Sequence, residues 1–114
     1  MFQKSTAQMT YEYETEPAIV AQACQDALNR VGKVTEVSRE TGTINGKIDT
    51  GFYAYAPVLL RVCKKGDITE LSVQASRNEG YGLWGTNGAQ KAIGILMQAM
   101  GQDTRLKGKA TGGW

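Results

Sequence analysis

The apolar pattern of this chain places two amphipathic helices on either side of a run of short β-patterned segments, and this arrangement restricts the fold most. Apolar residues recur at spacings of three and four over residues 15–31 and again over residues 87–100. Such spacings place side chains on one face of a helix. The first face carries Val20, Ala23, Cys24, Ala27, Leu28 and Val31, and the second carries Ala89, Ala92, Ile93, Leu96, Met97 and Met100. Each face must be buried against another layer, which the segments between the helices are predicted to supply.

Alternation of apolar and polar residues predicts five strands in the rest of the chain. They cover residues 9–13, 33–39, 43–49, 57–63 and 68–76. The order is therefore β-α-β-β-β-β-α, and the short connections make the middle strands antiparallel neighbours. We expect an α+β, two-layer sandwich in which an antiparallel sheet of four or five strands carries both helices on one face. In an alternative form of this fold, the sheet is strongly curved around the last helix and leaves a cavity.

Local signals mark the ends of the first helix. Thr15 is a candidate N-cap, and Pro17 falls in the first turn, where proline is tolerated. Gly32 follows the last apolar residue and is expected to end the helix in a left-handed conformation. Pro57 is expected at the start of a strand or on an edge, because it cannot donate to a sheet ladder.

Length and composition favour one ordinary globular domain. The chain has 114 residues, of which 41% are hydrophobic and 21% charged. We assign residues 1–101 to a single α+β domain and residues 102–114, which lack periodicity and carry several cations, to a flexible basic tail. The start of the chain has no secretory hydrophobic run, and no stretch approaches the length of a membrane span, so we expect a cytoplasmic protein.

The composition argues against most catalytic chemistry. The chain contains no histidine, which is the commonest general base and metal ligand. Its two cysteines, Cys24 and Cys63, cannot complete a structural zinc site and are expected to be small buried hydrophobes, with a disulfide as the alternative. The carboxylates fall on predicted solvent faces or turns. We therefore expect no catalytic residue, no metal and no cofactor, and a protein that is not an enzyme.

A glycine-rich segment, Gly80–Gly85, matches the dinucleotide-binding pattern GxGxxG and lies between a predicted strand and a predicted helix. A dinucleotide-binding unit also needs a second parallel strand with an acidic residue after the helix. Here the chain instead continues into a basic segment, so a connecting loop is the favoured interpretation. The alternative is an anion site at the helix N-terminus, formed by the backbone N–H groups of Gly85, Thr86, Asn87 and Gly88.

Aromatic residues are concentrated in two predicted loops, as Phe52, Tyr53, Tyr55, Tyr81 and Trp84. They are either hydrophobic plugs that close the core or the mouth of a site for a small apolar ligand or a protein, formed by Tyr53, Tyr55, Tyr81 and Trp84. Stacking on single-stranded nucleic acid is a third hypothesis. Two observations count against it: the net charge is only +2, and the central strands contain no aromatic residue.

One face of a central predicted strand carries Leu59, Arg61 and Cys63, so the outer face of the sheet is not fully polar. This favours contact with a second copy or another protein. Our leading hypothesis is a non-enzymatic binding or interaction module that self-associates through the sheet. A carrier of a small apolar ligand, or a weak anion or nucleic-acid binder at the glycine-rich loop, is the alternative.

The element order also resembles a loose set of small bacterial domains of unknown function, some of them attached to envelope lipoproteins. The similarity rests on residues 11–13 before the first helix, residues 40–44 before a hairpin strand, and Leu71–Val73 leading through the glycine-rich loop to the last helix. It covers about residues 9–101. The chain lacks the export signal and the lipidated cysteine of a lipoprotein member. The resemblance implies a fold and assigns no catalytic residue.

Overall fold

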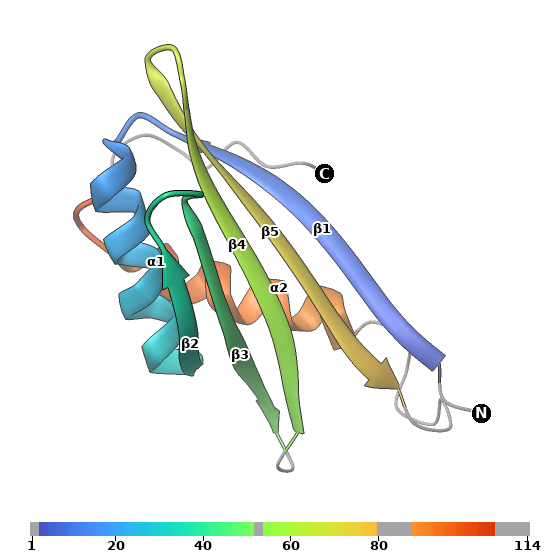
Figure 1. Cartoon of the computed structure of the whole chain (residues 1–114). Helices are drawn as coiled ribbons and strands as arrows, with labels where there is room; N and C mark the ends of the chain where they lie inside the picture. The colour runs from blue at the N-terminus through green and yellow to red at the C-terminus, as the bar shows by residue number, and fades with distance from the viewer. Residues whose placement is uncertain (1–2, 52–53, 80–87, 107–114) are drawn as a thin grey trace.

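The computed structural model describes residues 3–51, 54–79 and 88–106. It contains five strands and two helices in the expected order. The strands are β1 (Gln3–Tyr13), β2 (Gly32–Ser38), β3 (Thr43–Gly51), β4 (Ala54–Lys65) and β5 (Ile68–Glu79), and the helices are α1 (Pro17–Val31) and α2 (Gly88–Met100). Figure 1 views the sheet from its outer face, with both helices behind it. The α+β sandwich with an antiparallel sheet is confirmed.

The sheet order is β1-β5-β4-β3-β2, and every neighbouring pair is antiparallel. The chain makes β1 at one edge, passes through α1 along the back of the sheet, and returns as β2 at the opposite edge (Figure 1). Strands β2 to β5 then follow as a meander that closes against β1. Pairing with β5 begins at Val58, one residue after Pro57, so this proline lies where β4 has only β3 as a neighbour.

The core lies between the helices and the inner face of the sheet. Alternate residues of β4 and β5 point inward as predicted, among them Leu60, Leu71 and Val73, which are fully buried. Both helical stripes are buried against them, with Leu28 on α1 and Leu96 on α2 also at 0% exposure. Neither helix of the described chain is long and apolar enough to span a membrane.

Two of the expected helix-end signals act differently in the structure. Glu16, not Thr15, precedes the first helical residue, and its side chain forms no capping hydrogen bond. Thr15 is buried, and its backbone oxygen accepts a 2.6 Å hydrogen bond from the Thr69 hydroxyl, which joins the start of α1 to β5. Gly32 is extended rather than left-handed, with φ −176°, because the chain passes directly from α1 into β2. The predictions that Thr15 is the N-cap and that Gly32 ends the helix in a left-handed conformation were therefore wrong. The predicted position of Pro17 in the first turn is confirmed.

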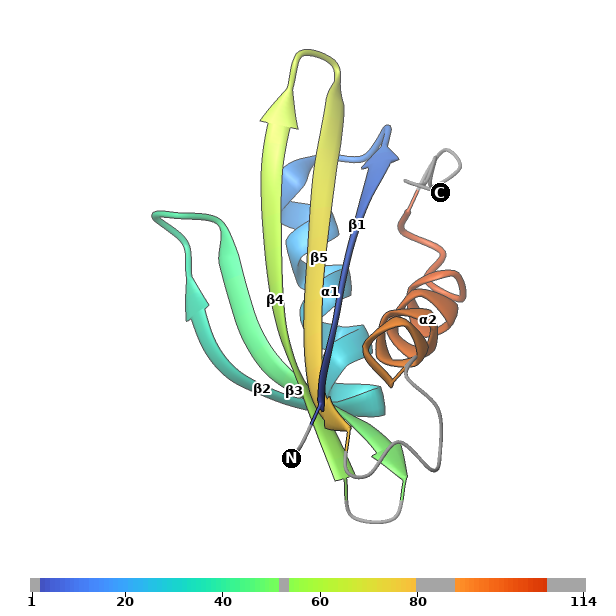
Figure 2. The same ribbon diagram turned by 90° about the vertical axis from the view of Figure 1, so that its right-hand side faces the viewer.

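The sheet is curved, and its curvature separates one hairpin from the helices. Figure 2 shows β2 and β3 bending away from the helix side of the sheet toward the turn that joins them. The register between β2 and β3 shifts between Val34 and Glu36. Such an irregularity bends a strand and increases its local twist. The tip of the β2–β3 hairpin therefore stands clear of the first turns of α1.

Candidate functional site

Leu59 and Arg61, which the sequence predicted as contacts with a partner, lie on the outer face of the sheet. Leu59 is half-buried on β4, and Arg61 is exposed two residues further along the same strand. The register places Leu59 between Asn45 of β3 and Gln74 of β5. Around it lies a shallow hollow of about 310 Å³. Leu59 is thus an apolar residue in a largely polar surround.

Neutral polar side chains surround Leu59 on this outer face. Cross-strand pairs place Gln8 beside Gln74, and Thr10 beside Ser72. Arg61 of β4 lies opposite Ser72 on the other side of β5, so Thr10, Ser72 and Arg61 are neighbours across three strands. Cys63 also lies on this face and is exposed, so the expectation that both cysteines are buried was wrong for this one. The expected disulfide alternative does not occur, because both cysteines are free.

The predicted aromatic mouth is only partly within the described residues. Tyr55 lies near the start of β4, opposite Asp49 of β3, and its side chain is 53% exposed. Tyr53, Tyr81 and Trp84 lie outside the described residues. Gly88 is the buried first residue of α2, while Gly85, Thr86 and Asn87 lie outside the described residues too. The aromatic mouth and the anion site at the glycine-rich loop stay predictions.

Sequence reasoning missed a groove beside the first helix. It has a volume of about 510 Å³ and runs between the first half of α1 and the tip of the β2–β3 hairpin. We call it the α1–hairpin groove. Its lining is Pro17, Ala18, Ala21, Gln22 and Gln25 from α1, Val37, Ser38, Arg39, Gly42, Thr43 and Ile44 from the hairpin, and Val62 from β4.

The groove has an apolar floor and polar sides. Ile44 is 2% exposed and forms the floor with the half-buried Val62. Alanines on α1 leave the space open, since a larger side chain at Ala18 or Ala21 would project into it. Val37 is 41% exposed on the opposite wall. The glutamines of α1 supply hydrogen-bonding groups beside it.

The sequence did contain a weak signal of this groove. The alternation in residues 33–39 is imperfect, and the structure shows why: the bulge in β2 changes which side chains face the helices. Val37 pairs with Ile44 and so faces the inner side, yet no helix covers it. That an inward-facing apolar residue stays uncovered can be recognised only once the curvature of the sheet is known.

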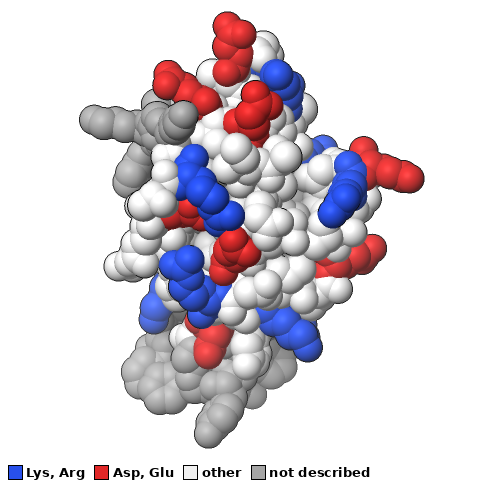
Figure 3. All heavy atoms as spheres, turned by 90° about the vertical axis from the view of Figure 1, so that its left-hand side faces the viewer, with Lys and Arg blue, Asp and Glu red and all other residues white. Residues whose placement is uncertain are grey.

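Charges on this side of the molecule do not form a field of one sign. Figure 3 looks onto the side of the molecule on which α1 lies and shows blue and red groups interspersed, with uncharged surface between them. A surface of this kind gives little long-range steering of a charged partner. Recognition in the groove would rest on apolar contact and a few hydrogen bonds, as in most small-molecule sites.

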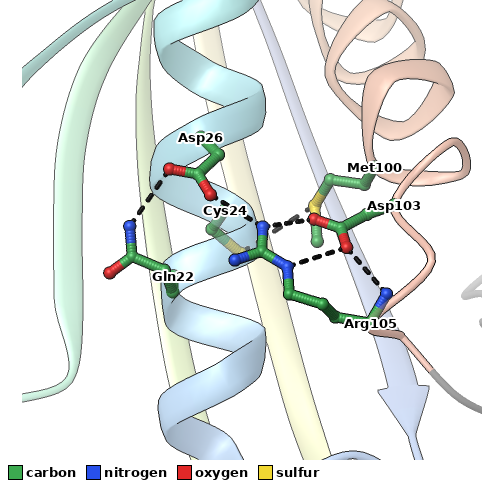
Figure 4. A network of polar contacts seen from close by, with 6 residues as sticks. All are labelled: Gln22, Cys24, Asp26, Met100, Asp103 and Arg105. Carbon is green, nitrogen blue, oxygen red and sulfur yellow. Dashed lines mark hydrogen bonds and ion pairs between the residues drawn. The ribbon is translucent and has the colours of Figure 1, made fainter.

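The residues after α2 pack against α1 through an arginine. Arg105 bonds to Asp103 at 2.6 Å and to Asp26 at 2.7 Å, and Asp26 also accepts from Gln22 at 3.0 Å (Figure 4). The hydrogen bond from Arg105 lowers the pKa of Asp103 to about 2 and also lowers that of Asp26. Leu106 contacts the core. Residues 102–106, expected to begin a flexible tail, thus make specific contacts, and residues 107–114 lie outside the described residues.

Beneath this network lies a buried pair of sulfur atoms. The Cys24 thiol donates to the Met100 sulfur at 3.8 Å, which joins α1 to the end of α2 (Figure 4). Burial, with a smaller effect of the Asp103 charge, raises the pKa of this thiol to about 12. The neighbouring Tyr13 also has a raised pKa, chiefly because it is buried. These groups stay neutral at physiological pH and serve as core contacts.

The described part of the chain contains no group of three or more residues placed to hold a metal ion. The carboxylates whose side chains the structure describes are exposed or already paired. Glu12 and Glu36 are exposed, and Glu70 forms a 3.0 Å ion pair with Lys65. The site with the most developed geometry is therefore the α1–hairpin groove.

Comparison with known proteins defines the fold. No protein-family model matches the chain, and no curated protein matches it. Among solved structures, Ara h 8.0201 is similar at a TM-score of 0.61 and 12% identity, over 87% of this chain and 97% of the other. CalU16 from Micromonospora echinospora is similar at 0.55 and 14% identity, over 90% and 86%. An Hsp90 activator from Plasmodium falciparum is similar at 0.52 and 19%, over 82% and 96%.

These similarities extend over most of each chain, so they support one common sheet-and-helix fold. The identities are too low to carry over any activity. None of the three is described as an envelope lipoprotein domain. The resemblance to such domains stays a prediction.

Proposed function

We propose that this chain is a non-enzymatic binding domain and that it takes a small, largely apolar ligand in the α1–hairpin groove. The observation that carries the proposal is the groove itself. Its volume of about 510 Å³ lies within the range of ligand pockets, roughly 300–1,000 Å³. An apolar floor with a few polar groups on the walls is the usual composition of such a site.

The exposed valine supports this location. Val37 exposes 41% of its surface on the groove wall. Covering it with an apolar ligand would remove that surface from water, which is favourable in proportion to the area. The polar side chains of Gln22 and Gln25 stand on the helix side, where they are placed to orient a polar group of the ligand.

The non-enzymatic part of the proposal rests on the placement of charged groups. The groove lining contains one charged residue, Arg39, and it contains no carboxylate, cysteine or lysine. General acid–base chemistry needs a titratable group within hydrogen-bond reach of the reacting atom. Nucleophilic chemistry needs an activated nucleophile with a base beside it. The lining offers binding contacts and neither of these arrangements.

The test compares two substitutions that are matched in exposure. Val37 lines the groove and is 41% exposed, while Ile19 is 39% exposed and lies outside the lining. We would titrate Nile red, an uncharged apolar fluorophore, into wild type, Val37→Glu and Ile19→Glu. A charge in the groove wall should weaken dye binding about tenfold or more, because an apolar ligand leaves the carboxylate poorly solvated. Ile19→Glu should bind like wild type.

Native mass spectrometry on freshly purified protein would complement the titration. A mass that exceeds the denatured mass, and that is lost in Val37→Glu, would identify the ligand class directly. Equal dye binding in all three proteins, or equal loss in both variants, would refute the groove as the ligand site.

A second candidate function is self-association through the outer face of the sheet. The observation that favours it is the neutral character of that face around Leu59, since interface cores are depleted in charged residues. The structurally similar Hsp90 activator is named for an effect on another protein, which is compatible with an interaction role. Leu59→Glu should convert a dimer to a monomer in light scattering. A monomeric wild type, or a variant of unchanged mass, would refute this candidate.

A further inference from the structure

A second cavity lies where α1 ends and β2 begins, and its lining is rich in cations. It has a volume of about 470 Å³ and is lined by Arg30, Val31, Gly32, Lys33, Lys47, Asp49 and Tyr55. It shares no lining residue with the α1–hairpin groove. We call it the lysine cavity. Three of its seven lining residues are cations, and one is an anion.

The register of the sheet places two of these cations directly against each other. Lys33 of β2 lies opposite Lys47 of β3, and the neighbouring pair is Gly32 with Ile48. Side chains of directly opposed residues in an antiparallel pair lie on the same face, about 5 Å apart at their Cβ atoms, and like charges there are destabilising. Both lysine side chains are exposed, so water screens part of the repulsion.

The cavity lining contains one carboxylate, that of Asp49. Within residues 3–51, 54–79 and 88–106, neither Lys33 nor Lys47 forms an ion pair with a carboxylate. Arg30 has a structural role of its own, because a cation in the last turn complements the helix dipole. The opposed lysines have no such role in the fold, although they face one cavity.

Besides the three cations, the lining of the lysine cavity contains an exposed aromatic residue, Tyr55. Tyr55 lies opposite Asp49, on the strand next to the one that carries Lys47. Tyr55 is 53% exposed beside a group of cations, where its side chain offers an apolar wall and a hydroxyl. Aromatic rings stack on planar ligand groups, and ammonium groups bind phosphate as point charges.

From this arrangement we infer that the lysine cavity binds the phosphate group of a small molecule. Lys33 and Lys47 donate to the phosphate oxygens, and Arg30 adds positive charge at the rim. Bound phosphate replaces the repulsion between the lysines with two attractive contacts. Tyr55 contacts whatever the phosphate is attached to, so an aromatic phosphate binds more tightly than free phosphate.

The experiment measures thermal stability and phosphate affinity in the full chain. The variants are Lys33→Gln and Lys47→Gln, with Lys91→Gln as a control, since Lys91 is an exposed lysine of α2 that is not part of this lining. Inorganic phosphate and phenyl phosphate are the probes, with sodium chloride at matched ionic strength as the reference. Each cavity substitution removes one charge-assisted hydrogen bond and should weaken phosphate binding about tenfold.

A specific site gives three results together. Phosphate raises the melting temperature of wild type and Lys91→Gln more than chloride does. Lys33→Gln and Lys47→Gln each reduce the rise in melting temperature that phosphate causes. Without ligand and at low salt, each of these two variants melts at a higher temperature than wild type, because the two opposed charges are gone. Tyr55→Ala reduces the preference for phenyl phosphate over inorganic phosphate.

Two results would overturn the inference. In the first, phosphate and chloride at equal ionic strength act alike on wild type. In the second, the cavity substitutions and Lys91→Gln lose phosphate binding equally, which would mean non-specific attraction to a cationic protein. Neither result bears on dye binding in the α1–hairpin groove, so the two proposals stand or fall separately.

Discussion

Glycine to alanine substitutions at two positions should change stability in opposite directions. Gly94 lies in the middle of α2, on its exposed side, and a Cβ atom there would meet no atom within 4 Å. Glycine in a helix interior is less favourable than alanine by about 0.8–1.0 kcal/mol. Gly94→Ala should therefore raise the free energy of unfolding by about 1 kcal/mol. For a chain of this length that corresponds to about 4 °C in melting temperature.

Gly32 is the matched position, and there the added methyl group has no space. Its Cβ atom would overlap the carbonyl oxygen of Lys47 and lie 2.9 Å from the Cα atom of Ile48. Both are backbone atoms of β3, which cannot rotate away as a side chain can. The alanine would have to part β2 from β3 at their first pair, at a cost of about 2 kcal/mol or more.

Urea unfolding followed by circular dichroism at 222 nm would measure both effects, with thermal melts as a second readout. The reasoning requires opposite signs. If Gly94→Ala were less stable than wild type, the surface of α2 at this position would not be open to an added methyl group. A Gly32→Ala variant as stable as wild type would mean that α1 and β2 do not join as closely as the structure shows. Either outcome would refute the packing argument.

Two further predictions concern titration and thiol chemistry. The pKa of Asp103 is about 2 in the folded chain and near 4 in a peptide, so its contribution to stability is complete above about pH 4 and lost as the pH falls toward 2. Arg105→Gln should lower the melting temperature at pH 7, and the difference from wild type should shrink below pH 4; a constant difference down to pH 2 would contradict this. Burial and a pKa of about 12 should keep Cys24 unreactive, while the exposed Cys63 reacts, so a thiol-labelling reagent should modify one cysteine per native chain and two after denaturation. Labelling of native Cys63→Ser at the wild-type rate would contradict that expectation.

The sequence predicted the elements well because their signals are local. The stripe that includes Val20 and Leu28 has the period of a helix, and it is buried as expected. Alternation in residues 57–63 and 68–76 likewise gave the inward faces of β4 and β5. The ends of elements were predicted less well. Gly32 was expected to end a helix by its φ angle, whereas it is required because two backbones approach closely.

The candidate site was the part that sequence reasoning missed. The residues proposed from the sequence lay in aromatic and glycine-rich loops and, as Leu59 and Arg61, on one face of a central strand. The α1–hairpin groove instead uses alanines, glutamines and a valine, which are ordinary residue types with no distinguishing spacing. Lys33 and Lys47 are 14 positions apart in the chain and face each other only because of the β2–β3 register.

The sequence by itself determined the number, type and order of the elements and which face of each is apolar. Hydrophobic periodicity is a property of neighbouring residues, so it can be recognised without knowing what packs against what. Only the tertiary structure decided that β1 pairs with β5 at the far edge, that the β2–β3 hairpin curves away from α1, and which side chains share a cavity. Those features depend on strand pairing and sheet curvature between segments distant in the chain, and no local pattern encodes such distances.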